Sequence, residues 1–108
     1  GVFIAVASSG DNRIMRSEDD GISWTTIASP EQNSWESITY GNGVWIAVSN
    51  NGTNKIMRSL DNGLTWQSVM SPEQNFWTSV AYGDNTFVAV SASGDNRVMR
   101  SEGIEGFE

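Results

Sequence analysis

The feature that most constrains the fold of this chain is an internal repeat of 42 residues. Residues 1–42 align with residues 43–84 without a gap, and 23 of these 42 positions are identical. Residues 85–108 continue the same alignment a third time but stop short of a full repeat. A period of about 40–45 residues is typical of β-propeller blades, each a four-stranded sheet. The repeat therefore predicts a single partial propeller, with residues 103–108 as an atypical tail.

One repeat contains four segments with the composition of β-strands. Residues 43–48 form a continuous apolar run, which is typical of a strand buried on both faces. Residues 55–59, 66–70 and 77–82 follow, separated by turns rich in Gly, Asn, Asp and Pro. No window shows the periodicity of an amphipathic helix. We therefore expect an all-β fold of four-stranded antiparallel blades, with ten strands in about two and a half blades.

A short motif, Ser-x-Asp-x-Gly-x-Ser/Thr-Trp, occurs once in each full repeat, directly after Ile-Met-Arg. Its glycine can take the positive φ that a tight turn requires, and its aspartate can accept hydrogen bonds from nearby backbone N–H groups. Its tryptophan opens the next strand and is expected to carry a large apolar area into the core. The motif residues are Ser17, Asp19, Gly21, Ser23 and Trp24 in the first copy, and Ser59, Asp61, Gly63, Thr65 and Trp66 in the second.

This motif resembles the Asp-box, or BNR repeat, of sialidases, sortilin-type receptors, xyloglucanases and many phage or bacterial proteins. The segment Tyr40–Val48 is also similar to repeat proteins of this sialidase-like propeller superfamily. The resemblance implies a structural turn on a propeller blade, away from any active site, and it says little about activity. It favours a location outside the cell or on a cell or virion surface, while the sequence itself leaves the compartment unknown.

The repeat is incomplete at both ends. The third copy of the motif fails after Glu102, so the last blade is expected to lack its outermost strand, and the first lacks the equivalent of residues 35–40. Propellers close with about 4–8 blades, and an open stack leaves apolar sheet faces in water. We expect a homo-oligomer that closes the ring, a dimer first and a trimer second. The alternative is a fragment of a longer propeller, and Gly1 in place of Met fits either a fragment or processing.

Composition argues against several classes of function. The chain has no Cys and no His, which removes disulfides, Cys-ligated zinc and the commonest general base. Thirteen acidic and six basic residues give a net charge of −7, which disfavours nucleic acid and anionic membrane surfaces. We therefore expect a non-enzymatic interaction scaffold with no catalytic residue, metal or cofactor.

An identical Ser-Pro-Glu-Gln-Asn loop precedes a tryptophan in each full repeat. Carboxylate and amide groups can hydrogen-bond sugar hydroxyls, and an indole can stack on a sugar ring. The loops therefore predict one glycan site per blade. The alternative is that recent duplication preserved the loop and that the tryptophans pack between blades. The candidate residues are Glu31, Gln32, Asn33 and Trp35 in the first repeat, and Glu73, Gln74, Asn75 and Trp77 in the second.

One arginine recurs at the same position in all three copies, as Arg16, Arg58 and Arg100. Sialidases grip a carboxylate with arginines, so the alternative function is a fragment of a sialidase-like or other glycoside hydrolase propeller that lacks its catalytic blades. Those enzymes draw their arginines from non-equivalent blades, whereas here the positions are equivalent. We therefore expect these arginines to pair with acidic neighbours such as Glu18 and Glu102, or to hydrogen-bond the turns.

Overall fold

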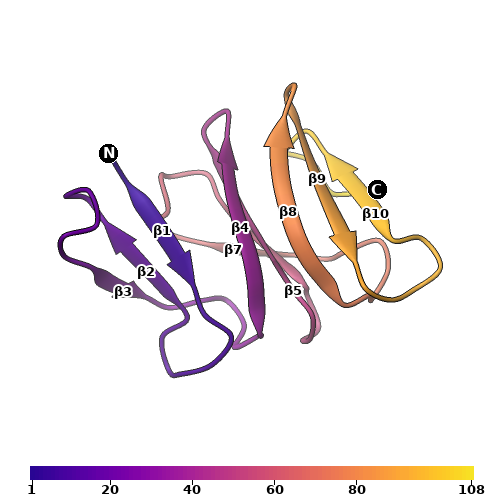
Figure 1. The fold of residues 1–108 in the computed structure, drawn as a ribbon, viewed down its shortest axis with the longest axis horizontal. Helices are drawn as coiled ribbons and strands as arrows, with labels where there is room; N and C mark the ends of the chain where they lie inside the picture. Colours follow the sequence, from indigo (N-terminus) through magenta and orange to yellow (C-terminus); the bar gives the residue numbers. More distant parts are fainter.

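Ten short strands make up the chain, and no helix is present. The computed structural model describes residues 1–108, and successive strands within each sheet pair antiparallel (Figure 1). The all-β fold expected from the repeat is confirmed. The strands are β1 (Phe3–Val6), β2 (Ile14–Ser17), β3 (Thr25–Ile27), β4 (Trp35–Gly41), β5 (Val44–Ser49), β6 (Ile56–Ser59), β7 (Gln67–Val69), β8 (Trp77–Gly83), β9 (Thr86–Ser91) and β10 (Val98–Ser101).

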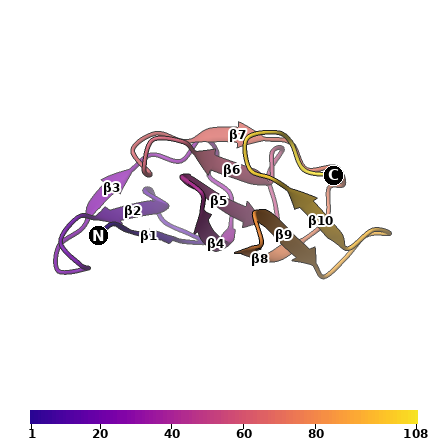
Figure 2. The ribbon, with the colours of Figure 1, turned by 90° about the horizontal axis from the view of Figure 1, so that it is seen from above.

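The strands form three sheets that follow the chain in order. Sheet 1 consists of β1-β2-β3, sheet 2 of β4-β5-β6-β7 and sheet 3 of β8-β9-β10. The sheets stand next to one another, with β4 beside β8 (Figure 1). Seen from above, β4 and β8 lie along one side of the molecule, and the outer strands β3 and β7 lie along the opposite side (Figure 2). Meander sheets arranged in this way are typical of propeller blades.

Tight turns join the first two strands of sheets 2 and 3. Asn42 and Gly43 connect β4 to β5 with φ values of 50° and 82°. Two successive positive φ values are those of a type I′ turn, whose twist suits a hairpin. Asp84 and Asn85 take the same conformation in sheet 3, because short polar side chains tolerate the left-handed region.

The core lies between the sheets. One cluster of buried side chains, which includes Trp35, joins sheets 1 and 2, and a second, which includes Trp77, joins sheets 2 and 3. Five of the six residues of β5 are buried, because sheet 2 has a neighbour on each face. The two tryptophans each begin the first strand of a sheet and fill the space beside the preceding sheet.

Other aromatic residues are less buried than the sequence pattern predicts. Trp24 is exposed, and Trp45 and Trp66 are only half-buried. Phe3, which occupies the position of Trp45 in the first repeat, is also exposed. The expectation that the motif tryptophans reach the core is wrong for Trp24. Trp24 and Phe3 are exposed for the same reason, because both lie in the first repeat, whose sheet has a neighbouring sheet on one side only.

Sheets 1 and 3 have three strands each, one fewer than sheet 2. Sheet 1 has no counterpart of β4, and sheet 3 has no counterpart of β7, as the repeat alignment predicts. Residues 103–108 run back beside β10. The Arg100 N–H donates to the Glu108 carbonyl at 2.8 Å, and the Glu108 N–H donates to the Arg100 carbonyl at 3.0 Å. The tail thus pairs with one residue of β10 in place of an outer strand.

Candidate functional site

The second copy of the Ser-x-Asp motif is closed by hydrogen bonds among its own residues. The Ser59 hydroxyl donates to the Asp61 carboxylate at 2.8 Å and accepts from the Gly63 N–H at 2.8 Å. The Asp61 carboxylate also accepts from the N–H of Thr65 at 2.9 Å and from its hydroxyl. The Trp66 indole N–H donates to the Gly63 carbonyl at 3.0 Å. The first copy makes the same set of bonds through the equivalent residues, Ser17, Asp19, Gly21, Ser23 and Trp24.

These bonds hold the pKa of Asp61 and of Asp19 at about 2, below the ordinary value of 3.8. The largest cause is the hydroxyl of Thr65 at Asp61 and of Ser23 at Asp19, followed by the backbone N–H of the same residue. A carboxylate that stays ionised and is hydrogen-bonded to its own turn is poorly suited to proton transfer at neutral pH. The geometry of the motif is therefore that of a structural turn.

Two of the three repeated arginines connect their own sheet to the next one. The Arg16 guanidinium of sheet 1 donates to the Asn62 carbonyl in the motif turn of sheet 2 at 2.9 Å, and it also pairs with Glu18. Arg58 of sheet 2 donates to the carbonyls of Gly103 and Ile104 in the tail of sheet 3. Arg100 is exposed. Arg16 and Arg58 therefore bind turn carbonyls between neighbouring sheets and do not converge on one site.

The first Ser-Pro-Glu-Gln-Asn loop fastens onto the turn between β5 and β6. The Glu31 carboxylate accepts from the N–H groups of Thr53 and Asn54 at 3.0 and 3.2 Å, and from the Asn54 side chain at 2.7 Å. Burial raises the pKa of Glu31, but hydrogen bonds from Asn54 and Thr53 outweigh it, so the pKa lies below its ordinary value. The Asn33 side chain donates to the Asn54 carbonyl at 2.8 Å, and Gln32 donates to the Asp11 carbonyl at 2.7 Å.

The second loop repeats this arrangement on the turn between β9 and β10. The Glu73 carboxylate accepts from the N–H groups of Asp95 and Asn96 at 3.3 and 3.2 Å, and from the Asn96 side chain. The Asn75 side chain donates to the Asn96 carbonyl at 2.8 Å. Gln74 donates to the Thr53 carbonyl at 3.1 Å. Polar groups of both loops, proposed above to face a sugar, are thus engaged in joining the sheets.

Trp35 and Trp77 do not present a stacking surface. Only 2% of Trp35 and 0% of Trp77 is exposed, and their indole N–H groups donate to the carbonyls of Glu31 and Glu73, both at 3.2 Å. The prediction that these two rings stack on a sugar is therefore wrong, because the indoles fill the space between neighbouring sheets. The alternative interpretation, in which they pack between blades, describes their position.

The basic residues directly before β2 and β6 also connect neighbouring sheets, a role that the sequence pattern alone did not predict. The Lys55 ammonium donates to the carbonyls of Gln74 and Asn75 at 3.1 and 3.2 Å, and Arg13 donates to the carbonyls of Gln32 and Asn33 at 3.0 and 2.8 Å. Lys55 is buried, which lowers its pKa. The signal was present in the sequence, since a basic residue stands directly before Ile/Val-Met-Arg in all three copies: Arg13, Lys55 and Arg97.

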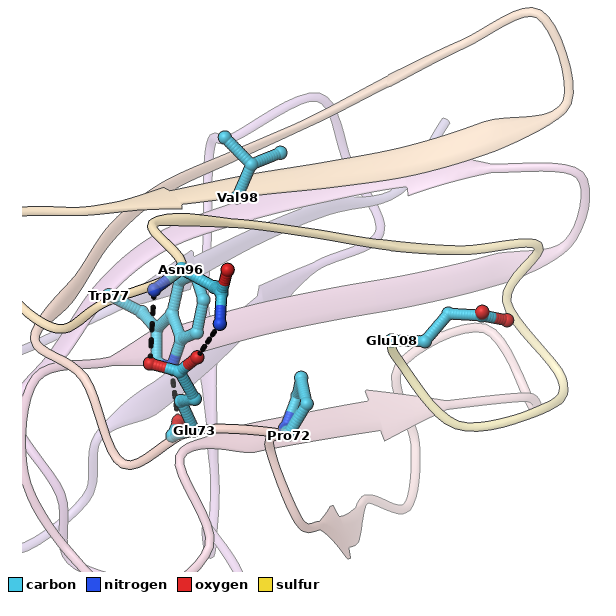
Figure 3. A pocket seen from close by; sticks show the side chains of 6 residues that line it. All are labelled: Pro72, Glu73, Trp77, Asn96, Val98 and Glu108. Carbon is cyan, nitrogen blue, oxygen red and sulfur yellow. Dashed lines mark hydrogen bonds between the residues drawn. The ribbon is translucent and has the colours of Figure 1, made fainter.

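One pocket of about 290 Å³ lies beside β10 (Figure 3). It is bounded by the loop that connects sheets 2 and 3, by the start of β10 and by the tail. Its carboxylate Glu73 is already hydrogen-bonded to Asn96, as Figure 3 shows. The lining residues are Pro72, Glu73, Trp77, Asn96, Val98 and Glu108.

Two further features bear on the type of site. Nowhere do three or more His, Cys, Asp or Glu side chains gather in a way that could hold a metal ion. The chain also has no helix that could cross a membrane.

Comparisons with known proteins concern the fold. No protein-family model matches the sequence, and no curated protein matches it. Among solved structures, the chain is similar to one described as "YCF48 bound to D1 peptide", with a TM-score of 0.68 and 13% sequence identity. The similarity covers 100% of this chain and 41% of that chain. The fold is of the β-propeller type. Sheets 1, 2 and 3 are consecutive propeller blades, and the chain spans about two-fifths of the length of the structure that it resembles.

Proposed function

We propose that this chain is a non-enzymatic β-propeller module that acts as an interaction scaffold, and that a second copy of the chain stacks on the free face of sheet 3. The observation that carries the proposal is a difference in burial between equivalent positions. On the outward face of sheet 3, Val88, Val90 and Val98 are 39%, 42% and 61% exposed. The residues 42 positions earlier in sheet 2 are all 0% exposed, because sheet 3 covers them: Ile46, Val48 and Ile56.

The opposite end of the molecule offers a matching surface. The outward face of sheet 1 exposes 52% of Phe3 and 39% of Met15, whereas the equivalent Phe87 and Met99 of sheet 3 are buried against sheet 2. Inside the molecule, each sheet packs one face against the opposite face of the next sheet. The free faces of sheets 3 and 1 are the equivalents of these two faces. Complete burial of a Val, Phe or Met side chain is favourable by about 1.5–3 kcal/mol, so covering these faces stabilises an assembly.

Charge also favours contact between these two ends. Arg97 and Arg100 stand on sheet 3, and Arg97 is hydrogen-bonded only within its own hairpin. The motif turn of sheet 1 carries three consecutive acidic residues, Glu18 to Asp20. Inside the molecule, Arg16 already binds the equivalent turn of sheet 2. Head-to-tail stacking would bring Arg100 near the acidic turn of the next copy. Two copies have six sheets, which suits a closed ring of about 4–8 blades.

The polar groups of the repeats support a scaffold rather than an enzyme. The carboxylates of the motif turns, two of the repeated arginines and both loop glutamates hold turns or neighbouring sheets in place. The structure that this chain resembles is described as bound to a peptide, which is compatible with a scaffold that holds other chains.

Molecular mass in solution tests the proposal. Light scattering at micromolar concentration is expected to give a dimer for the unaltered chain and a monomer for the double variant Val88→Asp, Val90→Asp. Leu64→Asp is the matched control, because Leu64 is exposed in a turn of sheet 2 and lies on neither free face. Unchanged far-ultraviolet circular dichroism shows that the variants fold. A folded, unaltered monomer would contradict the proposal.

A further inference from the structure

We infer that Asn42, in the turn between β4 and β5, is a site of spontaneous deamidation, and that the serine of the second motif protects Asn62 from the same reaction. Asparagine is among the residues that degrade most readily in proteins. The reactants are the chain and water, so the inference does not depend on the assembly proposed above. The chain contains three Asn-Gly pairs: Asn42-Gly43, Asn51-Gly52 and Asn62-Gly63.

The reaction proceeds through a ring formed by the chain itself. The backbone nitrogen of the glycine loses its proton and attacks the side-chain carbonyl carbon of the asparagine. A new N–C bond forms, the bond to the side-chain nitrogen breaks, and that nitrogen leaves as ammonia with the released proton. Water then opens the resulting succinimide at either of its carbonyl carbons, which gives aspartate or isoaspartate. Glycine favours the attack because it has no Cβ to hinder the approach.

The pair Asn42-Gly43 meets the requirements of this reaction. Both residues are exposed, and the N–H of Gly43 makes no hydrogen bond. No atom lies within 4 Å of the position that a Cβ of Gly43 would occupy, so the space around the turn is open. The φ of Asn42 is 50°, in the left-handed region, so the turn must open briefly for the attack. An exposed two-residue turn opens at little cost in free energy.

The pair Asn62-Gly63 has a similar backbone but a blocked nucleophile. Asn62 is also exposed, with a φ of 64°. Gly63, in contrast, is buried, and its N–H donates to the Ser59 hydroxyl at 2.8 Å. The Asn62 carbonyl is also held, because it accepts from the Arg16 guanidinium at 2.9 Å. The glycine nitrogen can therefore attack only after this hydrogen bond is broken and the turn has moved away from sheet 1.

The pair Asn51-Gly52 is restrained at the asparagine. The N–H of Gly52 makes no hydrogen bond. The Asn51 side-chain oxygen accepts from the Ser34 N–H at 2.7 Å, and its nitrogen donates to the Ser34 hydroxyl at 3.3 Å. These two bonds oppose the rotation that brings the side chain onto the glycine nitrogen. We expect Asn51 to react more slowly than Asn42 and faster than Asn62.

Deamidation of Asn42 changes both charge and backbone at the contact between sheets 2 and 3. The new carboxylate changes the net charge from −7 to −8. Isoaspartate also inserts one carbon atom into the backbone of the turn. The ring of Tyr82, in β8 of sheet 3, lies directly against the neighbouring Gly41, where no Cβ would fit. The longer backbone therefore lies next to a close contact between the two sheets.

Incubation of the whole protein at mildly alkaline pH, followed by peptide mapping with mass spectrometry, tests the inference. Asn42 is expected to deamidate about tenfold faster than Asn62, since the attack at Gly63 first requires the loss of a buried hydrogen bond. In protein unfolded with urea, the two rates are expected to become similar. Equal rates at Asn42 and Asn62 in the folded protein, or a faster rate at Asn62, would overturn the inference.

A variant tests the protective role of the motif serine. Ser59→Ala removes the acceptor of the Gly63 N–H, so it is expected to raise the rate at Asn62 about tenfold and to leave the rate at Asn42 unchanged. Ser68→Ala, at an exposed position of β7, is the matched control and is expected to change neither rate. An unchanged rate at Asn62 in folded Ser59→Ala would contradict the protective role. The comparison of folded and unfolded unaltered protein keeps the test valid if Ser59→Ala does not fold.

Discussion

Sheets 2 and 3 have closely similar sequences but very different surroundings. Sheet 2 is covered on both faces and has four strands, whereas sheet 3 is covered on one face and has three. Ile56 and Val98 occupy the same place in the repeat, yet one is completely buried and the other is mostly exposed. The comparison teaches that one repeat does not fix the environment of its own residues. The neighbouring blade does, as expected for repeat architectures whose stability is shared between neighbours.

The largest expected effect concerns the side chains between the sheets. Trp77→Ala is expected to lower the free energy of unfolding by about 3–5 kcal/mol, because it leaves a large cavity between sheets 2 and 3. Trp24→Ala, in the exposed motif of sheet 1, is expected to cost much less. Urea denaturation of the two variants measures the difference. Equal losses would show that burial in the structure does not govern stability.

A matched pair of substitutions addresses sheets 2 and 3 directly. Ile56→Ala is expected to cost about 2–5 kcal/mol, since its side chain is buried between the two sheets. Val98→Ala is expected to cost less than about 1 kcal/mol in a dilute sample, where the face of sheet 3 is free. If stacking occurs, the cost of Val98→Ala rises with protein concentration, while that of Ile56→Ala does not. Denaturation at two protein concentrations separates these outcomes.

Two glycines sharpen the contrast between a turn that faces another sheet and a turn that faces solvent. Gly63 has a φ of 84°, and a Cβ added there would lie 2.5 Å from Cδ1 of Ile4 in sheet 1. Gly43 has a φ of 82°, but no atom lies within 4 Å of an added Cβ. Gly43→Ala is therefore expected to cost only the backbone strain of about 1–2 kcal/mol. Gly63→Ala adds a steric clash, so its thermal unfolding midpoint is expected to be the lower of the two.

The smallest expected effect is on the pH dependence of stability. The folded-state pKa of Asp61, about 2, lies below its ordinary value of 3.8. The ionised form therefore stabilises the fold above about pH 3.8, and this contribution is lost as the pH falls towards 2. Asp61→Asn is expected to unfold with a shallower dependence on pH between about 4 and 2, and Asp19→Asn to behave alike. Denaturation at several pH values checks this, and an unchanged pH dependence would remove the turn aspartates from the explanation.

Much of the fold could be predicted from the sequence, because strands and turns depend on local patterns. The repeat placed the strands, and the loss of the motif after Glu102 indicated that the last blade lacks an outer strand. The roles of Trp35 and Trp77 could not be predicted in the same way. A tryptophan that begins a strand can stack on a ligand or fill the space between sheets, and only the position of the preceding sheet decides between these roles.

The identical Ser-Pro-Glu-Gln-Asn loops show a second limit. Their identical sequences are compatible with a ligand site, because carboxylate and amide groups can hydrogen-bond sugar hydroxyls. In the structure the same groups hydrogen-bond to N–H and carbonyl groups of the next hairpin. The Glu31 carboxylate, for example, accepts from the N–H groups of Thr53 and Asn54. Both partners recur with the repeat, so the loop is constrained by another part of the chain. Lys55 is constrained in the same way, because its ammonium donates to two carbonyls of the loop that follows it.

The central claim is that the outward face of sheet 3 is covered by a second copy of the chain. The most direct measurement is the accessibility of the Val88 and Val90 methyl groups to a soluble paramagnetic agent, observed by NMR with Val48 as the buried reference and Leu64 as the exposed one. At high protein concentration the two valines are predicted to be shielded like Val48, and on dilution to approach the exposure of Leu64. Equal accessibility of Val88, Val90 and Leu64 at every concentration would contradict the claim.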